Sequence, residues 1–378
     1  MKLTKILIIG LIITAFAFNP WISWDLREFK TTLAVIFAII IAGIQIYRNG
    51  IKPIDNKWFL MLLAYLPISL LFGNLPAITI HGENVSEFWF WKPFCYLIIF
   101  GIMAMAIASY EVSDKEIRKI FNVISWCGFL TAAYVIVQRI GADQFFYSTY
   151  SDTGKYAGFI GNPTLTAHYI AMTIPFTFYT KKWYFLPFMV ASLIICDSLV
   201  AGAGLICGIA YLLATNIQRA LIIGGIAITC VIAIVVLYPN HIKGREHERF
   251  DRWKQVVSDI KKPSFVTGRG IGSFQFFFRQ QNPGEGDKVN RFKQAHNDYL
   301  EWFYGVGLIG FILSILAFFK FAKEAFFRPS NRTRVVLSSL VMLLIICTAC
   351  FDLQVGTTMF FASLLAGLLM NKGFLCRY

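Results

Sequence analysis

The chain has 378 residues, of which 57% are hydrophobic and only 15% are charged, and its mean hydropathy is +0.61. A soluble domain of this length has no interior large enough to bury so much apolar surface, so the composition excludes a soluble globular protein. The net charge of +14 would suggest nucleic acid as a partner of a soluble protein. Here much of that charge lies in the connections between apolar runs, so no nucleic-acid partner is expected.

Apolar runs long enough to span a hydrocarbon core of roughly 30 Å recur along the whole chain. They predict an all-α polytopic membrane protein with about twelve transmembrane helices. We expect a single integral membrane domain over residues 1–378. The predicted spans are 5–22, 30–47, 57–73, 88–109, 119–140, 164–180, 183–198, 199–215, 219–238, 297–319, 334–351 and 353–371.

The positive charges predict the orientation of these spans. With the N-terminus inside, the inner connections contain about half of the 35 Lys and Arg residues, and the outer segment 73–88 contains none. We therefore expect both termini in the cytoplasm and the segments 141–163 and 239–295 outside. Most cysteines, including Cys347 and Cys350, fall within predicted spans, where small packing residues are expected rather than disulfides or a metal site.

The outer segment 239–295 is longer than a connection between two helices requires. At 100° per residue, Arg245, Arg249 and Arg252 fall within about 60° of one another. The neighbouring stripe is apolar: Phe250, Trp253, Val257 and Ile260. This pattern predicts an interfacial helix that lies with its apolar side on the outer leaflet. Its guanidinium groups suit a diphosphate, because they donate bidentately, but arginines that anchor the helix to lipid headgroups fit equally well.

The segment ends at the run His296-Asn-Asp-Tyr-Leu-Glu301, where the chain enters the next predicted span. Asp298 is predicted to be the N-cap of that helix, with Glu301 completing a capping box. His296 then lies just outside the helix and within reach of water. An imidazole can accept a proton from a hydroxyl group at neutral pH. A lone histidine needs no function, so the residue alone leaves catalysis open.

The same run, followed by Gly305-Val-Gly307-Leu-Ile-Gly310, resembles the hallmark of the O-antigen ligase and O-antigen polymerase superfamily. Three upstream elements agree with that family in order and spacing: Gly161-Asn162-Pro163, Arg249-Phe-Asp-Arg-Trp253 and Gly268-Arg-Gly270-Ile-Gly272-Ser-Phe274. The resemblance covers roughly residues 155–310. It implies a multi-pass protein of the bacterial inner membrane that transfers a glycan from undecaprenyl diphosphate on the outer face.

By this resemblance His296 activates the acceptor hydroxyl, on lipid A-core or another glycan, and Arg249 holds the diphosphate. The other expected substrate-binding residues are Arg245, Arg252, Arg269, Lys92, Lys155 and Asn162. Lys92 also fits an anchor in the aromatic belt. No Asp-x-Asp motif lies in either outer segment. We therefore expect an inverting transfer without a metal or cofactor, in which arginine and lysine meet the charge of the leaving group.

One element departs from the family pattern. Members often carry Ser-Arg-Gly at the outer end of a mid-chain helix, whereas this chain has Asp197-Ser198-Leu199 there, without an arginine. Arg139, Lys155 and Arg269 are the candidates to supply the missing charge.

The charge of the two outer segments separates two functions within the superfamily. The segment 239–295 has 12 Lys and Arg against 6 Asp and Glu, but 141–163 has only Lys155 against Asp143 and Asp152. Polymerases often have two sizeable basic outer loops, so the sequence favours a ligase, with a polymerase as the alternative. A transporter or lipid flippase is the more remote alternative. It predicts ionisable residues deep in the spans, where this chain has few.

Overall fold

The computed structural model describes residues 2–17, 26–50, 56–72, 79–80, 83–84, 87–143, 156–214, 225, 253–254, 256–258, 260, 264–274, 295–327, 330–350 and 352–375. In this part the protein is helical except for one short hairpin. The α-helices are α1 (Leu3–Phe16), α2 (Leu26–Asn49), α3 (Lys57–Phe72), α4 (Glu87–Ser109), α5 (Asp114–Arg139), α7 (Pro163–Tyr179), α8 (Leu186–Cys196), α9 (Leu199–Leu213), α13 (Ser264–Thr267), α16 (Asp298–Phe327), α17 (Asn331–Ile346), α18 (Gly356–Met370) and α19 (Lys372–Leu375).

Short 3-10 helices lie at Gly158–Ile160, Trp183–Phe185 and Asp352–Gln354. The hairpin pairs β1 (Thr79–Ile80) with β2 (Glu83–Asn84) in antiparallel register.

The helices follow the predicted spans closely. Each predicted span overlaps a helix, apart from 219–238, of which the structure describes only Gly225. Three helical segments are long and apolar enough to cross a membrane: Phe29–Asn49, Asp114–Arg139 and Asp298–Phe321. Shorter apolar helices of 10–17 residues include α1, α8, α9 and α18. The chain is thus a membrane protein with several apolar helices, and the number of crossings stays a prediction.

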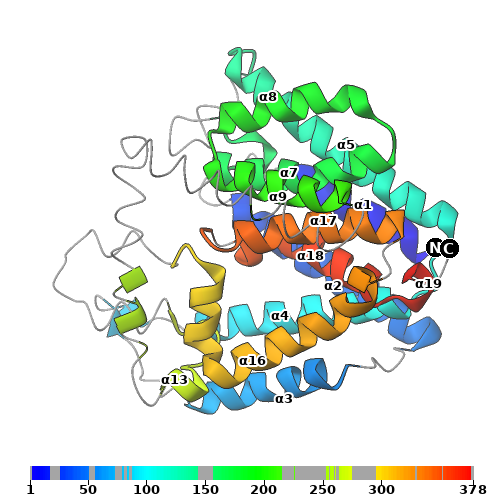
Figure 1. The fold of residues 1–378 in the computed structure, drawn as a ribbon. Coiled ribbons are helices and arrows are strands. Elements are labelled where there is room, and N and C mark those ends of the chain that lie inside the picture. The colour runs from blue at the N-terminus through cyan, green and yellow to red at the C-terminus, as the bar shows by residue number, and fades with distance from the viewer. Residues whose placement is uncertain are drawn as a thin grey trace.

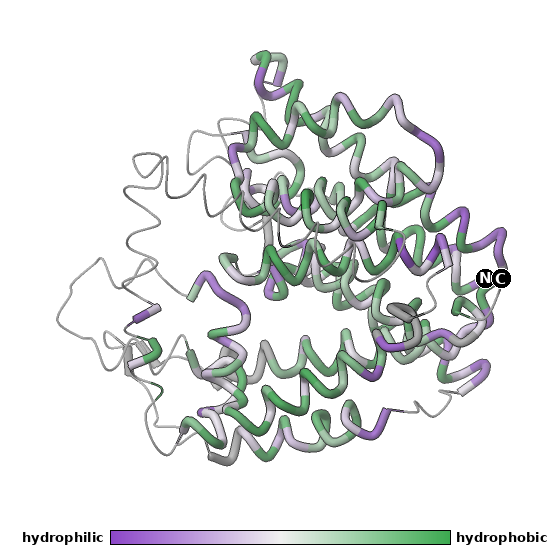
Figure 2. The backbone as a smooth tube through the Cα atoms, in the orientation of Figure 1, coloured by the Kyte–Doolittle hydropathy of each residue, from purple (hydrophilic) through white to green (hydrophobic). Residues whose placement is uncertain are grey.

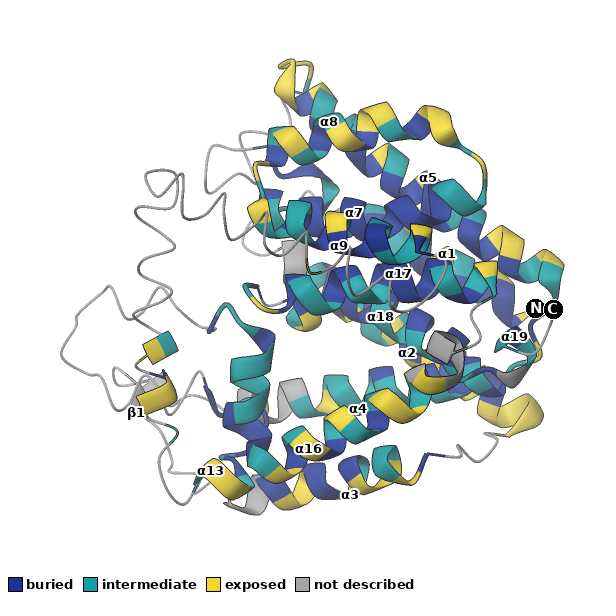
Figure 3. Ribbon diagram, in the orientation of Figure 1, coloured by how far each residue is buried: buried dark blue, intermediate teal, exposed yellow. Residues whose placement is uncertain are grey.

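In Figure 1, α3, α4, α13 and α16 lie below the other labelled helices, and α18 joins them to the rest through α4. α17 packs against α9 and α7, and α18 packs against α4 and α2, while α16 packs against α3 and α13. α7 is buried along almost its whole length, from Pro163 to Thr177. Peripheral helices instead turn large apolar side chains outward, such as Ile39, Ile194 and Phe319, which are 52%, 74% and 63% exposed (Figure 3). This exposed apolar surface fits contact with lipid.

Polar contacts gather at the ends of the helices, where Figure 2 shows the hydrophilic residues. At one end, Thr4 at the start of α1 donates to Glu116 at 2.9 Å, and Arg332 at the start of α17 pairs with Asp114 at 2.8 Å. Asn371, just after α18, donates to the carbonyl of Ile107 at 3.0 Å. The starts of α1, α5 and α17 therefore lie at the same end of the bundle as the end of α18.

Small residues allow the central helices to approach closely. A Cβ on Gly208 of α9 would lie 2.4 Å from the Met342 side chain of α17. At this contact Ser338 donates to the carbonyl of Gly208 at 2.6 Å, and Ser339 donates to Met172 of α7 at 2.8 Å. In lipid, the hydrophobic effect does not drive helices together, so close packing and hydrogen bonds of this kind stabilise their association.

Candidate active site

The two glycine-rich stretches of the sequence pack directly against each other. α16 contains a non-helical residue, Gly307, with φ 63° and ψ −169°, so the helix breaks near its first third. The break frees two carbonyl groups: Tyr304 accepts from the N–H of Arg269 at 3.1 Å, and Gly305 accepts from that of Gly270 at 2.8 Å. Irregular backbone within an apolar helix is tolerated when other protein groups satisfy its hydrogen bonds, as Arg269 and Gly270 do here.

The backbones approach so closely that side chains cannot fit between them. A Cβ on Gly268 would lie 2.2 Å from the oxygen of Gly305, and one on Gly307 would lie 2.3 Å from the nitrogen of Gly268. Gly268 also has a φ of +76°, which favours glycine. Tyr65 of α3 donates to the carbonyl of Thr267 at 2.7 Å and so fixes the start of this turn.

This turn places Arg269, one of the predicted substrate-binding residues. Its guanidinium donates to the Tyr304 hydroxyl at 2.7 Å and lies 5.0 Å from the centroid of the Tyr304 ring. Tyr304 is 2% exposed and belongs to a small apolar cluster with Val256, Phe274 and Ala295. Arg269 is thus held half-buried against the same cluster that contains the residue before His296.

His296 occupies a bend between this cluster and α16. Its φ of 53° lies in the left-handed region, which few residues other than glycine adopt and which often marks functional sites. The preceding residue, Ala295, is fixed on both sides. Its N–H donates to Glu301 at 3.1 Å, and its carbonyl accepts from the indole of Trp253 at 2.8 Å. His296 is half-buried, and its position is determined by these contacts.

The predicted capping box is wrong in its details. α16 begins at Asp298, and the N-cap is Asn297, whose side chain accepts from the N–H of Leu300 at 3.0 Å. Asp298 instead accepts from the N–H of Leu353 at 3.1 Å, and its own N–H donates to the carbonyl of Cys347 at 2.9 Å. The helix therefore starts one residue earlier than expected, directly after the cap at Asn297, and Asp298 ties it to the turn before α18.

The segment after Arg252 also differs from its prediction. Residues 253–254 and 256–258 are helical, but Val256 is fully buried whereas Val257 is 59% exposed. Trp253 and Ile260 were expected to face the outer leaflet, and instead they contact Ala295 and its cluster. Trp253 and Ile260 of the predicted apolar face therefore pack on the protein near His296, whereas Val257 of the same face is exposed.

The other predicted site residues have different outcomes. Asn162 is the N-cap of α7 and accepts from the N–H of Leu165 at 3.2 Å, so its amide has a structural use. Arg139 ends α5 and donates to the Tyr156 hydroxyl at 3.2 Å. Lys92 lies in α4, but its side chain is not described. Four further predicted residues lie outside the described residues: Lys155, Arg245, Arg249 and Arg252.

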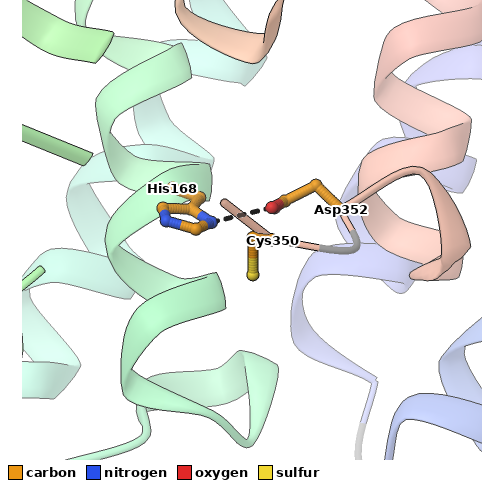
Figure 4. A group of neighbouring side chains, drawn as sticks. All are labelled: His168, Cys350 and Asp352. Atoms are coloured by element: carbon orange, nitrogen blue, oxygen red, sulfur yellow. Dashed lines mark hydrogen bonds and ion pairs between the residues drawn. The ribbon is translucent and has the colours of Figure 1, made fainter. Parts of the chain in front are cut away.

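Sequence reasoning missed a second polar cluster, which Figure 4 shows. His168 of α7 and Asp352, in the turn between α17 and α18, are both fully buried, and His168 Nδ1 lies 2.8 Å from Asp352 Oδ2. Cys350 is nearby, and one ligand atom of each of the three residues lies within 4.8 Å of the others, close enough to consider a metal ion. Of the six described cysteines, none forms a disulfide. A signal existed in the sequence: a histidine in an otherwise apolar span.

Residues 169–315 match the family model described as O-antigen ligase. The matched region contains the His296 bend, the two glycine-rich stretches and Trp253. No curated protein matches the sequence.

Proposed function

We propose that this membrane protein, whose residues 169–315 form an O-antigen ligase domain, transfers a glycan from undecaprenyl diphosphate to an acceptor hydroxyl outside the inner membrane. The observation that carries the proposal is the hydrogen bond from Trp253 to Ala295. It joins the Arg249–Trp253 element to the residue directly before His296. The bend at His296, Arg269 and Trp253, the last residue of that element, therefore converge on the cluster around Tyr304.

In the proposed mechanism His296 accepts the proton of the acceptor hydroxyl as the oxygen attacks the anomeric carbon. The bond from that carbon to the phosphate oxygen breaks, the configuration inverts, and undecaprenyl diphosphate leaves. The rigid bend at His296 supports this role, because a general base must be held in position before the reaction. Arginine guanidinium groups meet the negative charge of the leaving diphosphate.

The burial of Val256 supports Arg249 and Arg252 as the residues that hold the diphosphate. They precede Val256 by seven and four positions, a spacing that shares one face of a helix. Val256 packs against Phe274, Ala295 and Tyr304, which are neighbours of His296 and Arg269. We infer from this spacing that Arg249 and Arg252 serve the site at His296 rather than lipid headgroups. Arg245, Lys155 and Lys92 remain further proposed contacts on the same outer side.

Replacement of Arg249 by lysine is expected to lower the transfer rate by about 10- to 100-fold, because lysine keeps the charge but cannot donate bidentately. Arg48→Lys, at the far end of α2, is the matched control and should retain full activity. The measurement is transfer by the purified protein from a lipid-linked donor.

We also expect that transfer to persist in excess EDTA. Recovery of a chelated, inactive enzyme on addition of Mg²⁺ would show that a metal neutralises the diphosphate.

The proposed orientation places residues 239–295 outside and both termini in the cytoplasm. In a cysteine-free background, Ser258→Cys should react with a membrane-impermeant maleimide in cells with a permeabilised outer barrier. Ser258 is exposed in the structure. Lys181, just after the C-terminal end of α7, is also exposed and serves as the control. Lys181→Cys should react only after lysis. The opposite pattern would place the His296 bend in the cytoplasm and overturn the proposal.

Within the superfamily we favour a ligase over a polymerase. A polymerase must hold a growing chain and a new lipid-linked unit together, whereas one strongly basic outer segment fits a single lipid diphosphate. The segment 239–295 has 12 Lys and Arg against 6 Asp and Glu, and 141–163 has no such excess. A transporter or flippase is less well supported, because the His296 bend and Arg269 form a convergent site at a helix start rather than a charged path through the spans.

A further inference from the structure

The buried histidine–aspartate pair is part of a longer chain of side chains. On the side of the ring opposite Asp352, His168 Nε2 lies 3.4 Å from the hydroxyl oxygen of Ser198. Ser198 is the N-cap of α9, and His168 lies one turn into α7. The order Ser198, His168, Asp352 therefore runs from a half-buried hydroxyl, through a fully buried imidazole, to a fully buried carboxylate.

The hydrogen bonds define one consistent set of proton positions. Ser198 Oγ accepts from the N–H of Ala201 at 3.3 Å, which leaves its O–H to point at His168 Nε2. In the tautomer that satisfies both contacts, His168 Nδ1 donates to Asp352 and Nε2 is left to accept. A buried carboxylate that fixes the tautomer of a histidine beside a hydroxyl is the geometry of nucleophilic serine catalysis. A separation of 3.4 Å is long for a hydrogen bond, but such contacts tighten when substrate binds.

The backbone around Ser198 presents its hydroxyl as a nucleophile requires. Asp197, directly before it, has a φ of 51°, so the serine follows a sharp left-handed turn between α8 and α9. The first N–H groups of a helix have no carbonyl partner within it and favour negative charge. Those of Leu199 and Val200, the first two residues of α9, directly follow Ser198 and are suited to an oxyanion. A Cβ on Gly202, four residues after Ser198, would meet nothing within 4 Å, so the surface of α9 is open at that position.

We propose that Ser198, His168 and Asp352 form a second active centre, in which Ser198 attacks the carbonyl carbon of an apolar carboxylic ester. The Ser198 proton passes to His168 Nε2 as the Oγ–carbon bond forms, and the alkoxide leaves with that proton. Water then attacks the acyl-serine, His168 takes the proton of the water and returns it to Ser198, and a carboxylic acid is released. Leu199 and Ile194, which are 52% and 74% exposed, flank the turn and suit an acyl chain.

The alternative is that these side chains hold a metal ion with Cys350. That arrangement has to displace the hydrogen bond between His168 and Asp352, because Cys350 lies on the Nδ1 side of the ring (Figure 4). The Nε2 atom, which is left for a ligand, faces Ser198 instead. The hydrogen-bonded chain uses both ring nitrogens of His168 without such a rearrangement. His168 and Asp352 lie outside residues 169–315, whereas Ser198 lies within them.

The test is covalent labelling of the full-length purified protein with a fluorophosphonate, followed by mass spectrometry of the labelled peptide. We expect Ser198 to be labelled, and Ser198→Asn, which preserves the cap of α9, to remove the label. His168→Gln and Asp352→Asn should slow labelling by at least about 100-fold. Ser192→Ala, at a buried serine of α8 that bonds to its own helix, is the matched control and should be labelled normally.

Hydrolysis of p-nitrophenyl octanoate should follow the same pattern and exceed hydrolysis of the acetate. Cys350→Ser and excess EDTA should change neither readout, and loss of labelling in either would support the metal site and overturn the proposal. Failure of the wild-type protein to label at Ser198 would overturn it as well, even if His168→Gln does not fold. Ser198→Asn should retain glycan transfer, so the two proposed activities succeed or fail separately.

Discussion

Replacement of His296 is expected to abolish glycan transfer, with a fall in rate of at least about 100-fold, because it removes the proposed general base. The best substitution is His296→Asn, since asparagine also adopts the left-handed backbone found at this residue. It removes the base and leaves the bend in place. Transfer by the purified protein from a lipid-linked donor is the measurement, with membrane insertion and thermal stability measured in parallel.

The neighbouring residue provides the control for this variant. Asn297→Ala removes the N-cap of α16 and is expected to cost about 1 kcal/mol of stability while leaving measurable transfer. Full activity in His296→Asn would remove the imidazole from the mechanism. Equal losses in both variants would show that the bend, rather than the base, determines the rate.

Gly268→Ala is expected to have the largest effect on the structure of the site. The new Cβ would lie 2.2 Å from the backbone oxygen of Gly305, and the residue has a φ of +76°. Backbone strain and overpacking together should cost about 2–6 kcal/mol, because neither backbone can move aside without breaking the hydrogen bonds of Arg269 and Gly270. Arg269 would lose its place on Tyr304, and transfer should be lost with it.

Gly43→Ala is the matched control for this experiment. Gly43 lies in the middle of α2, and a Cβ there would meet nothing within 4 Å. The substitution should be neutral or stabilise by about 0.5–1 kcal/mol. Thermal unfolding in detergent compares the two variants. A Gly268→Ala protein that melts like the wild type would mean that the two glycine-rich stretches do not pair as described.

The helices could be predicted from the sequence because a membrane span needs a long apolar run. The predicted boundary between 183–198 and 199–215 agrees with the structure, in which the separate helices α8 and α9 meet at Asp197 and Ser198. The same reasoning overestimated the length of several spans. α17 was expected to continue to residue 351, but it ends at Ile346, where the carbonyl of Cys347 turns to accept from the N–H of Asp298.

The site was harder to predict than the helices, because its contacts join residues far apart in the chain. The motifs indicated His296 and the glycines, but not that one glycine stretch fits into the break made by the other. Aspartate is a residue type that often caps helices, yet the carboxylate of Asp298 accepts a hydrogen bond from the N–H of Leu353, 55 residues away. His168 lies 184 residues from Asp352, so nothing local in the sequence could indicate their pairing.

The most direct test of the proposed function is the lipid-linked material that accumulates when the gene is deleted. A ligase acts on the finished chain, so we predict that polymer of normal length builds up on undecaprenyl diphosphate and that none is attached to the final acceptor. The His296→Asn protein should fail to restore attachment, whereas the Gly43→Ala protein should restore it. Accumulation of single repeat units on the lipid carrier, instead of long chains, would contradict the proposal and identify the protein as the polymerase.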